Sequence, residues 1–308
     1  MSAENIKMFI CNYEQQQPEN NVNIYFSRRM SAKYVTHMPM VSDEVQKGIA
    51  STVLPYVKEQ LNQNAIVEYN PVGVVDGEIE SMESINVSLV QEFLNSITPE
   101  NIYKEMNTLK IDKIGFYCVE IVLDNQKLFL FRQFQKLTKL RKGYMTRIVR
   151  DELTAMDTDF LGIDETTDII LFENEIFLLN HISLERIFEY KDEFLKKTNE
   201  ALGEILNKNV IANIDQFAED CCRDVRITKR FTNIMTKGRL PLFFDNYDKV
   251  PEIVEELGLD IEFDRDGKLV YKEKSQLFHI INLLSDSYFK SLLANRPGIA
   301  KMEEEIHR

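Results

Sequence analysis

Apolar residues gather in short, nearly continuous runs in the middle of the chain. One pair of runs, at 114–123 and 127–134, is separated only by Asp-Asn-Gln, and a second pair, at 168–172 and 176–180, is joined by Glu173-Asn174-Glu175. Short apolar runs that are bounded by turn residues predict β-hairpins. Because neither pair alternates with polar residues, we expect these strands to be central in a sheet and covered on both faces.

The pattern becomes helical after Ser183. Apolar residues then recur at helical spacing through about Leu206, and further helices are predicted at 213–222 and 225–237, the latter closed by Gly238. A third hairpin is predicted at 259–271, with its turn at Asp266-Gly267. The pattern ends with two predicted helices, at about 275–284 and 287–294.

The N-terminal third is less regular. We expect a short strand near Lys7 to Asn12, and a helix from about Asp43 to Asn62 that is capped by Ser42 and kinked at Pro55. The run 65–75 has an extended pattern that ends at Asp76-Gly77. "TPEN" at 98–101 predicts the start of a short helix, with Thr98 as its cap and Pro99 in its first turn.

Together these elements predict an α+β fold. Its mixed sheet is built from hairpins and flanked by helices, with a smaller N-terminal α/β lobe. A chain of 308 residues exceeds the usual size of a single core. We therefore expect two domains, an N-terminal α/β lobe at 1–108 and an α+β domain at 109–308.

The sequence favours a cytoplasmic protein. It opens without a basic and then apolar segment, and its apolar runs are far shorter than the roughly 20 residues of a membrane span. Four cysteines, with Cys221 and Cys222 adjacent, show no CxxC spacing. We expect no direct membrane insertion, so that recruitment to the inner membrane would need a partner.

Charge is distributed unevenly along this acidic chain. The formal net charge is −13, yet residues 125–150 contain 8 basic and no acidic side chains. Within "FRQFQKLTKLRKGYMTRIVR", at 131–150, the apolar positions fit one helical face, whereas Gly143 and the preceding strand fit an extended arm with a basic tip. Either form displays cations to nucleic acid, an acidic membrane or an acidic partner, unless acidic groups elsewhere in the fold balance them.

A second cationic surface is predicted on the helix at 225–237. If Asp224 caps this helix, Arg226, Lys229, Arg230 and Lys237 share one face. Such a face can follow a phosphate backbone, or it can be a solvated face paired with acidic neighbours. The candidate DNA-binding residues are the cations of 127–150 and 223–239, namely Lys127, Arg132, Lys136, Lys139, Arg141, Lys142, Arg147, Arg150, Arg223, Arg226, Lys229, Arg230, Lys237 and Arg239.

Catalytic signatures are weak by comparison. Asp168 with Glu189-Tyr190-Lys191 matches the letters of a metal-dependent nuclease, but Glu189 continues a helical pattern instead of a strand, so we interpret the match as chance. The four histidines lack metal-ligand spacing, and there is no phosphate loop or G-x-S-x-G motif. We predict no catalytic residue, metal or cofactor, and more readily a binding protein than an enzyme.

The order of several segments resembles a known family. "KLFLFRQF", the basic stretch, "TTDIILFENEIFLLN", "LERIFEYKDEFL" and "FDRDGKLVYKEKSQLFHIINLLSDSYFKSLL" together resemble the C-terminal domain of the B component of Kiwa, a bacterial two-component anti-phage defence system, over roughly residues 109–295. The final "LANRPGIAKMEEEIHR" departs from the aromatic-rich tail of that family.

The resemblance implies a cytoplasmic DNA-binding protein that acts with the membrane-embedded A component of Kiwa and forms a homodimer or a larger assembly. It supplies no catalytic residues. The leading hypothesis is therefore a DNA-binding effector of anti-phage defence that binds DNA largely without sequence preference. Two alternatives stay open: a metal-dependent nuclease with an unrecognised site, and a module that binds an acidic protein or an anionic membrane.

Overall fold

The chain forms two compact units. The computed structural model describes residues 2–19, 21–31, 33–105, 108–134, 146–149, 152–155, 162–291, 293 and 295–300. Unit 1 comprises Met1–Tyr69 and Val74–Glu189, and unit 2 comprises Asn70–Gly73 and Tyr190–Arg308. The domain boundary expected between residues 108 and 109 thus falls inside unit 1.

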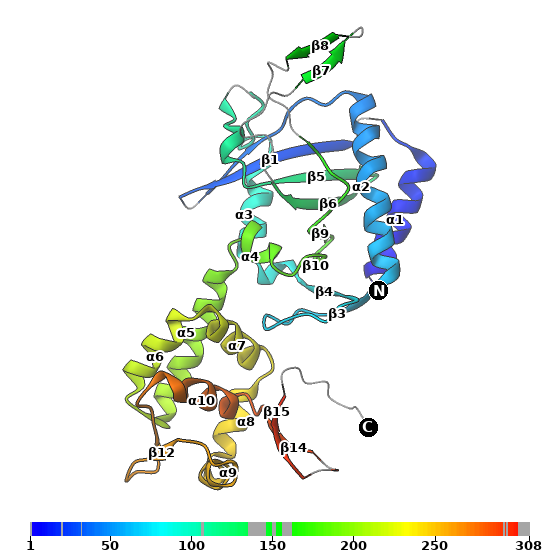
Figure 1. Ribbon diagram of the computed structural model, residues 1–308. Coiled ribbons are helices and arrows are strands. Elements are labelled where there is room, and N and C mark those ends of the chain that lie inside the picture. The colour runs from blue at the N-terminus through cyan, green and yellow to red at the C-terminus, as the bar shows by residue number, and fades with distance from the viewer. Residues whose placement is uncertain are drawn as a thin grey trace. The chain divides into compact units, whose positions relative to one another are not determined.

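Unit 1 is built on an eight-stranded mixed sheet with the order β2-β1-β5-β6-β9-β10-β4-β3 (Figure 1). Its strands are β1 (Val22–Met30), β2 (Lys33–His37), β3 (Ala65–Glu68), β4 (Glu78–Glu83), β5 (Phe116–Leu123), β6 (Gln126–Gln133), β9 (Ile169–Phe172) and β10 (Glu175–Leu178). Only β3 and β4 pair in parallel within this sheet. Because β1 pairs with β5, strands from both sides of residue 108 share one sheet. This pairing explains why unit 1 extends past residue 108 to Glu189.

The two central hairpins are confirmed. β5 pairs with β6 from Phe116↔Gln133 to Leu123↔Gln126, and β9 pairs with β10. Asp124 and Glu173 take positive φ in the connecting turns. The α+β prediction, with a mixed sheet built from hairpins and flanked by helices, is therefore also confirmed.

Helices cover both faces of this sheet, as the continuous apolar runs predict. On one face, α1 (Ser2–Gln16) and α2 (Asp43–Gln63) bury apolar side chains against the strands. On the other face, Phe93 of α3 (Ser88–Ser96) and Phe188, which follows α4 (Ser183–Ile187), both contact the ring of Phe131. Unit 1 also contains short 3-10 helices at Ser84–Asn86 and Ile111–Lys113.

Two predictions for the N-terminal third are wrong. The segment expected as a strand near Lys7 lies inside α1, because Ile6, Phe9, Ile10 and Tyr13 recur at helical spacing and are buried together. The helix expected from Thr98 is absent and residues 98–101 form turns. The Thr98 hydroxyl donates instead to the carbonyl of Asn95, at the end of α3 (3.2 Å).

The helix predicted from Asp43 is confirmed as α2. It continues through Pro55 to Gln63, and Ser42 precedes it without a side-chain capping bond. The extended segment at 65–75 is confirmed only for β3, which ends at Glu68.

Unit 2 is mainly helical. Its helices are α5 (Lys191–Lys208), α6 (Ile214–Arg223), α7 (Val225–Thr236), α8 (Arg239–Asp245), α9 (Val250–Leu257) and α10 (Leu277–Leu284), with 3-10 helices at Tyr247–Lys249 and Lys274–Gln276. Its small sheets join β11 (Ile211–Ala212), β13 (Leu269–Val270) and β12 (Glu262–Phe263), and β14 (Tyr288–Lys290) with β15 (Pro297–Ile299). The core holds the fully buried rings of Phe217, Phe231 and Tyr271.

In the C-terminal half, one sequence prediction is confirmed and two differ from the structure. The helical pattern after Ser183 is divided into α4 and α5, because Glu189 takes a positive φ between them. The hairpin around Asp266-Gly267 is confirmed as β12 and β13, with Gly267 at φ +79°. The last predicted helix, at 287–294, is wrong, because β14 pairs there with β15 as an antiparallel hairpin.

Candidate functional site

The basic stretch lies in the connection between β6 and β9. These two strands are antiparallel neighbours, paired from Leu128↔Phe172 to Phe131↔Ile169. A connection of two residues is enough to join antiparallel neighbours. The connection at 134–168 is therefore a long insertion at one end of the sheet.

The described part of this insertion is extended. Within it, β7 (Thr146–Val149) pairs in antiparallel register with β8 (Glu152–Ala155). Of the two structures that the sequence allowed for the basic stretch, the extended one holds for residues 146–149, which include Arg147. Apart from Arg132, the other candidates of this stretch lie outside the described residues: Lys136, Lys139, Arg141, Lys142 and Arg150.

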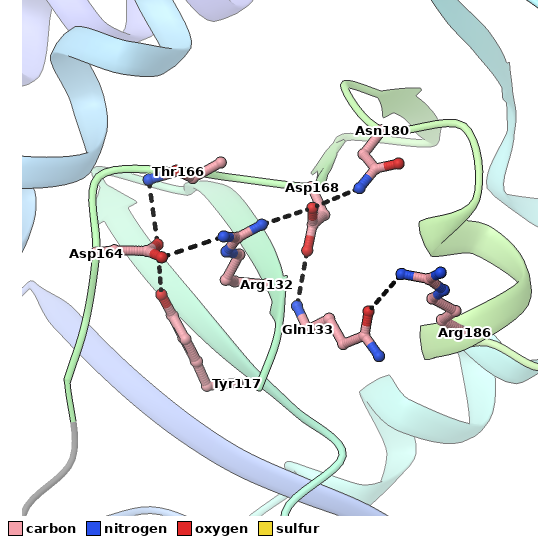
Figure 2. Close-up of polar contacts among 8 residues, drawn as sticks. All are labelled: Tyr117, Arg132, Gln133, Asp164, Thr166, Asp168, Asn180 and Arg186. Atoms are coloured by element: carbon pink, nitrogen blue, oxygen red, sulfur yellow. Dashed lines mark hydrogen bonds and ion pairs between the residues drawn. The ribbon is translucent and has the colours of Figure 1, made fainter. Parts of the chain in front are cut away.

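The two ends of the insertion are joined by ion pairs to Arg132. Its Nη1 donates to Asp168 Oδ1 (2.9 Å) and its Nη2 donates to Asp164 Oδ2 (3.1 Å), so the guanidinium lies between the two carboxylates (Figure 2). The side chains of Arg132 and Asp168 are only 14% and 2% exposed. Asp168 also accepts hydrogen bonds from the backbone N–H of Gln133 (2.8 Å) and from Asn180 (3.1 Å). Its carboxylate is therefore well satisfied inside the protein.

Asp164 extends this network toward the sheet. It accepts from the backbone N–H of Thr166 (3.2 Å) and from the Tyr117 hydroxyl (3.4 Å). Burial, and then the charge of Asp164, raise the pKa of Tyr117. Burial lowers the pKa of Arg132, but its bonds with the two carboxylates outweigh this effect and the net shift is upward. Arg132 therefore balances the charges of Asp164 and Asp168 inside the protein.

Lys127 also has an internal partner. Its Nζ lies 2.8 Å from Glu120 Oε1, and the Glu120 side chain is only 2% exposed. Glu120 Oε2 accepts from Tyr25 (2.5 Å) and Asn23 (2.8 Å). The Lys127 side chain is 56% exposed, so it lies between a buried carboxylate and solvent.

The cationic helix predicted in unit 2 is α7. As predicted, Asp224 caps it, accepting from the backbone N–H of Arg226 (2.9 Å). The same carboxylate is held by the Arg226 guanidinium, with Nη2 2.7 Å from Oδ2. Both bonds lower the pKa of Asp224, and the bond from the Arg226 side chain has the larger effect. Arg223 forms an ion pair with Glu219 one turn earlier.

The other cations of this surface differ in burial. Arg230 is half-buried and donates to Asn282 Oδ1 (2.6 Å), and burial lowers its pKa. The Nζ of Lys229 lies 5.6 Å from the ring centroid of Phe194. Lys237 is exposed and has no ion-pair partner in the described part of the chain. The last candidate, Arg239, is half-buried at the start of α8.

The residues of the nuclease-like match are engaged elsewhere. Asp168 is bound to Arg132, whereas Glu189 forms an ion pair with Arg29 (2.6 Å). Among the described residues, no three His, Cys, Asp or Glu side chains are grouped so that they could hold a metal ion. Cys221 is a buried free thiol, and burial raises its pKa, which disfavours the nucleophilic thiolate.

Some residues of these sites were missed in the sequence. Asp164 and Asn180, which complete the surroundings of Arg132, carry no local signal because their positions depend on the pairing of β6 with β9. Phe278 and Asn282 of α10, which contact the arginines of α7, were read only as parts of a helix. Their spacing of four residues, on the same side of a helix, is the one signal that could have linked them.

In the part of the chain that the structure describes, none of the helices combines the length and the apolar character needed to cross a bilayer.

The fold and these sites define an α+β protein with a long insertion in its sheet, basic only in its first part up to Arg150, and a second unit that displays a cationic helix. A family model described as "Kiwa protein KwaB-like" matches residues 111–294, and the chain belongs to this family. It is thus a component of a Kiwa anti-phage defence system, and membership implies a complex with other Kiwa subunits. Neither a curated protein nor a solved structure matches the chain.

Proposed function

We propose that this chain is the DNA-binding effector of its Kiwa system. In this proposal it is a cytoplasmic, non-enzymatic protein that binds DNA largely without sequence preference, acts with the membrane-embedded A component, and works as a homodimer or larger assembly. The observation that carries the proposal is the first part of the β6–β9 insertion, because residues 134–150 hold six of the eight cations of a stretch without acidic residues, whereas the seven acidic residues of the insertion all follow at 151–168.

The length of the insertion supports a role outside the sheet. Loops beyond about 15 residues are uncommon in compact domains and are usually functional or disordered. The sheet is continuous without the insertion, because β6 and β9 pair directly. Arg132 also binds both Asp164 and Asp168, where the insertion leaves and re-enters the sheet. Pairing of the central strands therefore does not depend on the cations from Lys136 to Arg150, which can serve a ligand.

Phosphate binding suits these residues. Arg and Lys form charge-assisted bonds with phosphate oxygens, and such contacts fix position without reading sequence. The rest of the chain is acidic, so it would repel DNA and limit contact to the basic surfaces. In unit 2, α7 offers the arginines Arg226 and Arg230, and the exposed Lys237 that follows it, to the same kind of ligand.

A gel shift at several salt concentrations, beside a plasmid cleavage assay with Mg²⁺ or Mn²⁺, tests the proposal. If about six cations meet phosphates, the slope of log K against log salt is about −5. We expect DNA to shift strongly at low salt and to remain uncut. Equal affinity at low and high salt would contradict the proposal.

The same assay separates the alternatives. Metal-dependent nicking that disappears in Asp168→Asn would support the nuclease. Asn preserves the shape of the side chain and one acceptor oxygen, which can serve either the Gln133 N–H or Asn180. Binding to anionic vesicles or to membranes that contain the Kiwa A component, with no DNA shift at any salt concentration, would support the interaction module.

A further inference from the structure

An aromatic ring is displayed on the cationic surface of unit 2. α10 is buried along most of its length, but Phe278 is 38% exposed. The guanidinium carbons of Arg226 and Arg230 lie 5.8 and 5.6 Å from the centroid of its ring. One aromatic ring is thus associated with two cations that lie one turn apart on α7.

Both arginines are held in place. Arg226 is bound through two of its nitrogens to Asp224, with Nε 3.1 Å from Oδ1 and Nη2 2.7 Å from Oδ2. Arg230 donates to the buried Asn282 (2.6 Å). Fixed planar groups lose little conformational entropy when a flat ligand stacks on them.

The two arginines differ in charge balance. Arg226 has the carboxylate of Asp224, whereas Arg230 is bonded to a neutral amide and has no carboxylate partner among the described residues. A half-buried guanidinium that keeps its net charge is suited to an anion such as phosphate. Burial lowers the pKa of Arg230, because a half-buried guanidinium is less well hydrated than an exposed one.

We propose that Phe278, Arg226 and Arg230 form a stacking position for an unpaired nucleotide, so that unit 2 binds single-stranded DNA in preference to duplex. The base stacks on the Phe278 ring or on the guanidinium plane beside it, and Arg230 binds the adjacent phosphate. Stacked bases in a duplex cannot offer their faces in this way, whereas single strands can. This inference rests on the proposed DNA-binding function and names the form of DNA bound by unit 2.

Substitutions at Phe278 test the proposal by fluorescence anisotropy, with labelled oligothymidine and with a duplex of equal length. We expect Phe278→Ala and Phe278→Leu to weaken binding of the single strand about tenfold. Duplex binding through the basic stretch should stay within about twofold of the unsubstituted chain. Equal effects on both forms of DNA, or no effect on either, would overturn the inference while leaving the proposed function intact. Failure of the unsubstituted chain to bind either form would overturn both.

A fluorescence signal gives an independent readout. The chain contains no Trp, so Phe278→Trp places its only indole on this surface. We expect oligothymidine to quench this emission by stacking, and the duplex to leave it nearly unchanged. Tyr103→Trp is the control. Tyr103 is 50% exposed and belongs to unit 1, whereas Phe278, Arg226 and Arg230 belong to unit 2. Equal quenching of both variants, or quenching of neither, would contradict the proposal.

Discussion

The guanidinium of Arg132 lies 2.9 Å from the buried carboxylate of Asp168, and this pair closes the base of the β6–β9 insertion. The backbone N–H of Asp168 also donates to the carbonyl of Phe131 (2.9 Å). Side chain and backbone therefore hold the two ends of the insertion together. Arg132 acts as an internal partner, which separates it from the cations that we propose for DNA binding.

Arg132→Gln tests this internal role. The substitution leaves the buried Asp168 without its charged partner, and we expect the free energy of unfolding to fall by about 3 kcal/mol. Urea denaturation measures the change. The control is Arg186→Gln, since Arg186 is exposed and donates only to the side chain of Gln133 among the described residues, and it should cost less than about 0.5 kcal/mol. Equal effects of the two substitutions would show that Arg132 is not an internal anchor.

Lys127→Met separates structural from DNA-binding cations. The substitution removes the cation beside the buried Glu120, so we expect a loss of about 1 kcal/mol, limited by the exposure of Lys127 to solvent. DNA affinity should remain unchanged. Lys113→Met serves as the control for stability, because Lys113 is exposed and has no side-chain partner in the described chain. If Lys127→Met weakens DNA binding without destabilising the protein, Lys127 belongs to the DNA-binding surface.

Tyr271→Phe should change how stability depends on acid pH. The Tyr271 hydroxyl donates to Asp220 Oδ2 (2.8 Å), and this bond is the main cause that lowers the pKa of Asp220. A lowered carboxyl pKa contributes stability that is present above the ordinary value near 4 and is lost as pH falls through the folded-state value. We expect the fall in unfolding free energy from about pH 5 to about pH 3 to be smaller in Tyr271→Phe.

The matched control for this measurement is Tyr13→Phe. Tyr13 is a buried tyrosine whose pKa is raised by burial. Unlike Tyr271, it has no bond to a carboxylate among the described residues. Its acid profile should keep the shape of the unsubstituted protein. The same pH profile for Tyr271→Phe and the unsubstituted chain would refute the role of Tyr271 in the ionisation of Asp220.

Substitutions at Asp224 separate its two roles on α7. Asp224→Ala removes the cap and should cost about 1 kcal/mol, whereas Asp224→Asn retains a good capping residue and should cost much less. Both remove the negative charge beside Arg226 and should strengthen DNA binding slightly. Thermal unfolding and anisotropy measure the two effects. Weaker DNA binding by Asp224→Asn would mean that the anchored geometry of Arg226 matters more than its free charge.

The sequence predicted the central hairpins well because their signals are local. Apolar runs with short polar turns at Asp124 and Glu173 determine both the strands and their pairing. α1 was missed because its apolar residues between Lys7 and Asn12 form a run too short to distinguish a strand from a helix. Thr98 has the residue type of a helix cap, but no helix begins there, because its hydroxyl donates back to the carbonyl of Asn95 in α3.

The surroundings of the cations could be predicted only in part. The Asp224 cap follows from residues next to α7, and it was found in the sequence. The partners of Arg132 are more than thirty residues away along the chain, and only the register Phe131↔Ile169 brings them near. Charge counting alone therefore could not distinguish Arg132 from the other cations of its stretch.

Charge reversal in the basic stretch of the insertion tests the central claim most directly. Lys139, Arg141 and Lys142 would be changed together to Glu, and the matched control would change Lys33, Lys47 and Lys104, which are exposed in unit 1 and have no ion-pair partner in the described chain. Both triple variants alter the net charge equally. Their thermal unfolding should match that of the unsubstituted chain.

The decisive measurement is the affinity of both triple variants for duplex DNA across a salt series. We predict that reversal in the insertion weakens binding by at least about a hundredfold at low salt and reduces the salt slope by about three, while the control triple stays within a fewfold. Equal losses in the two variants, or no loss from reversal in the insertion, would contradict the claim that this stretch is the DNA-binding surface.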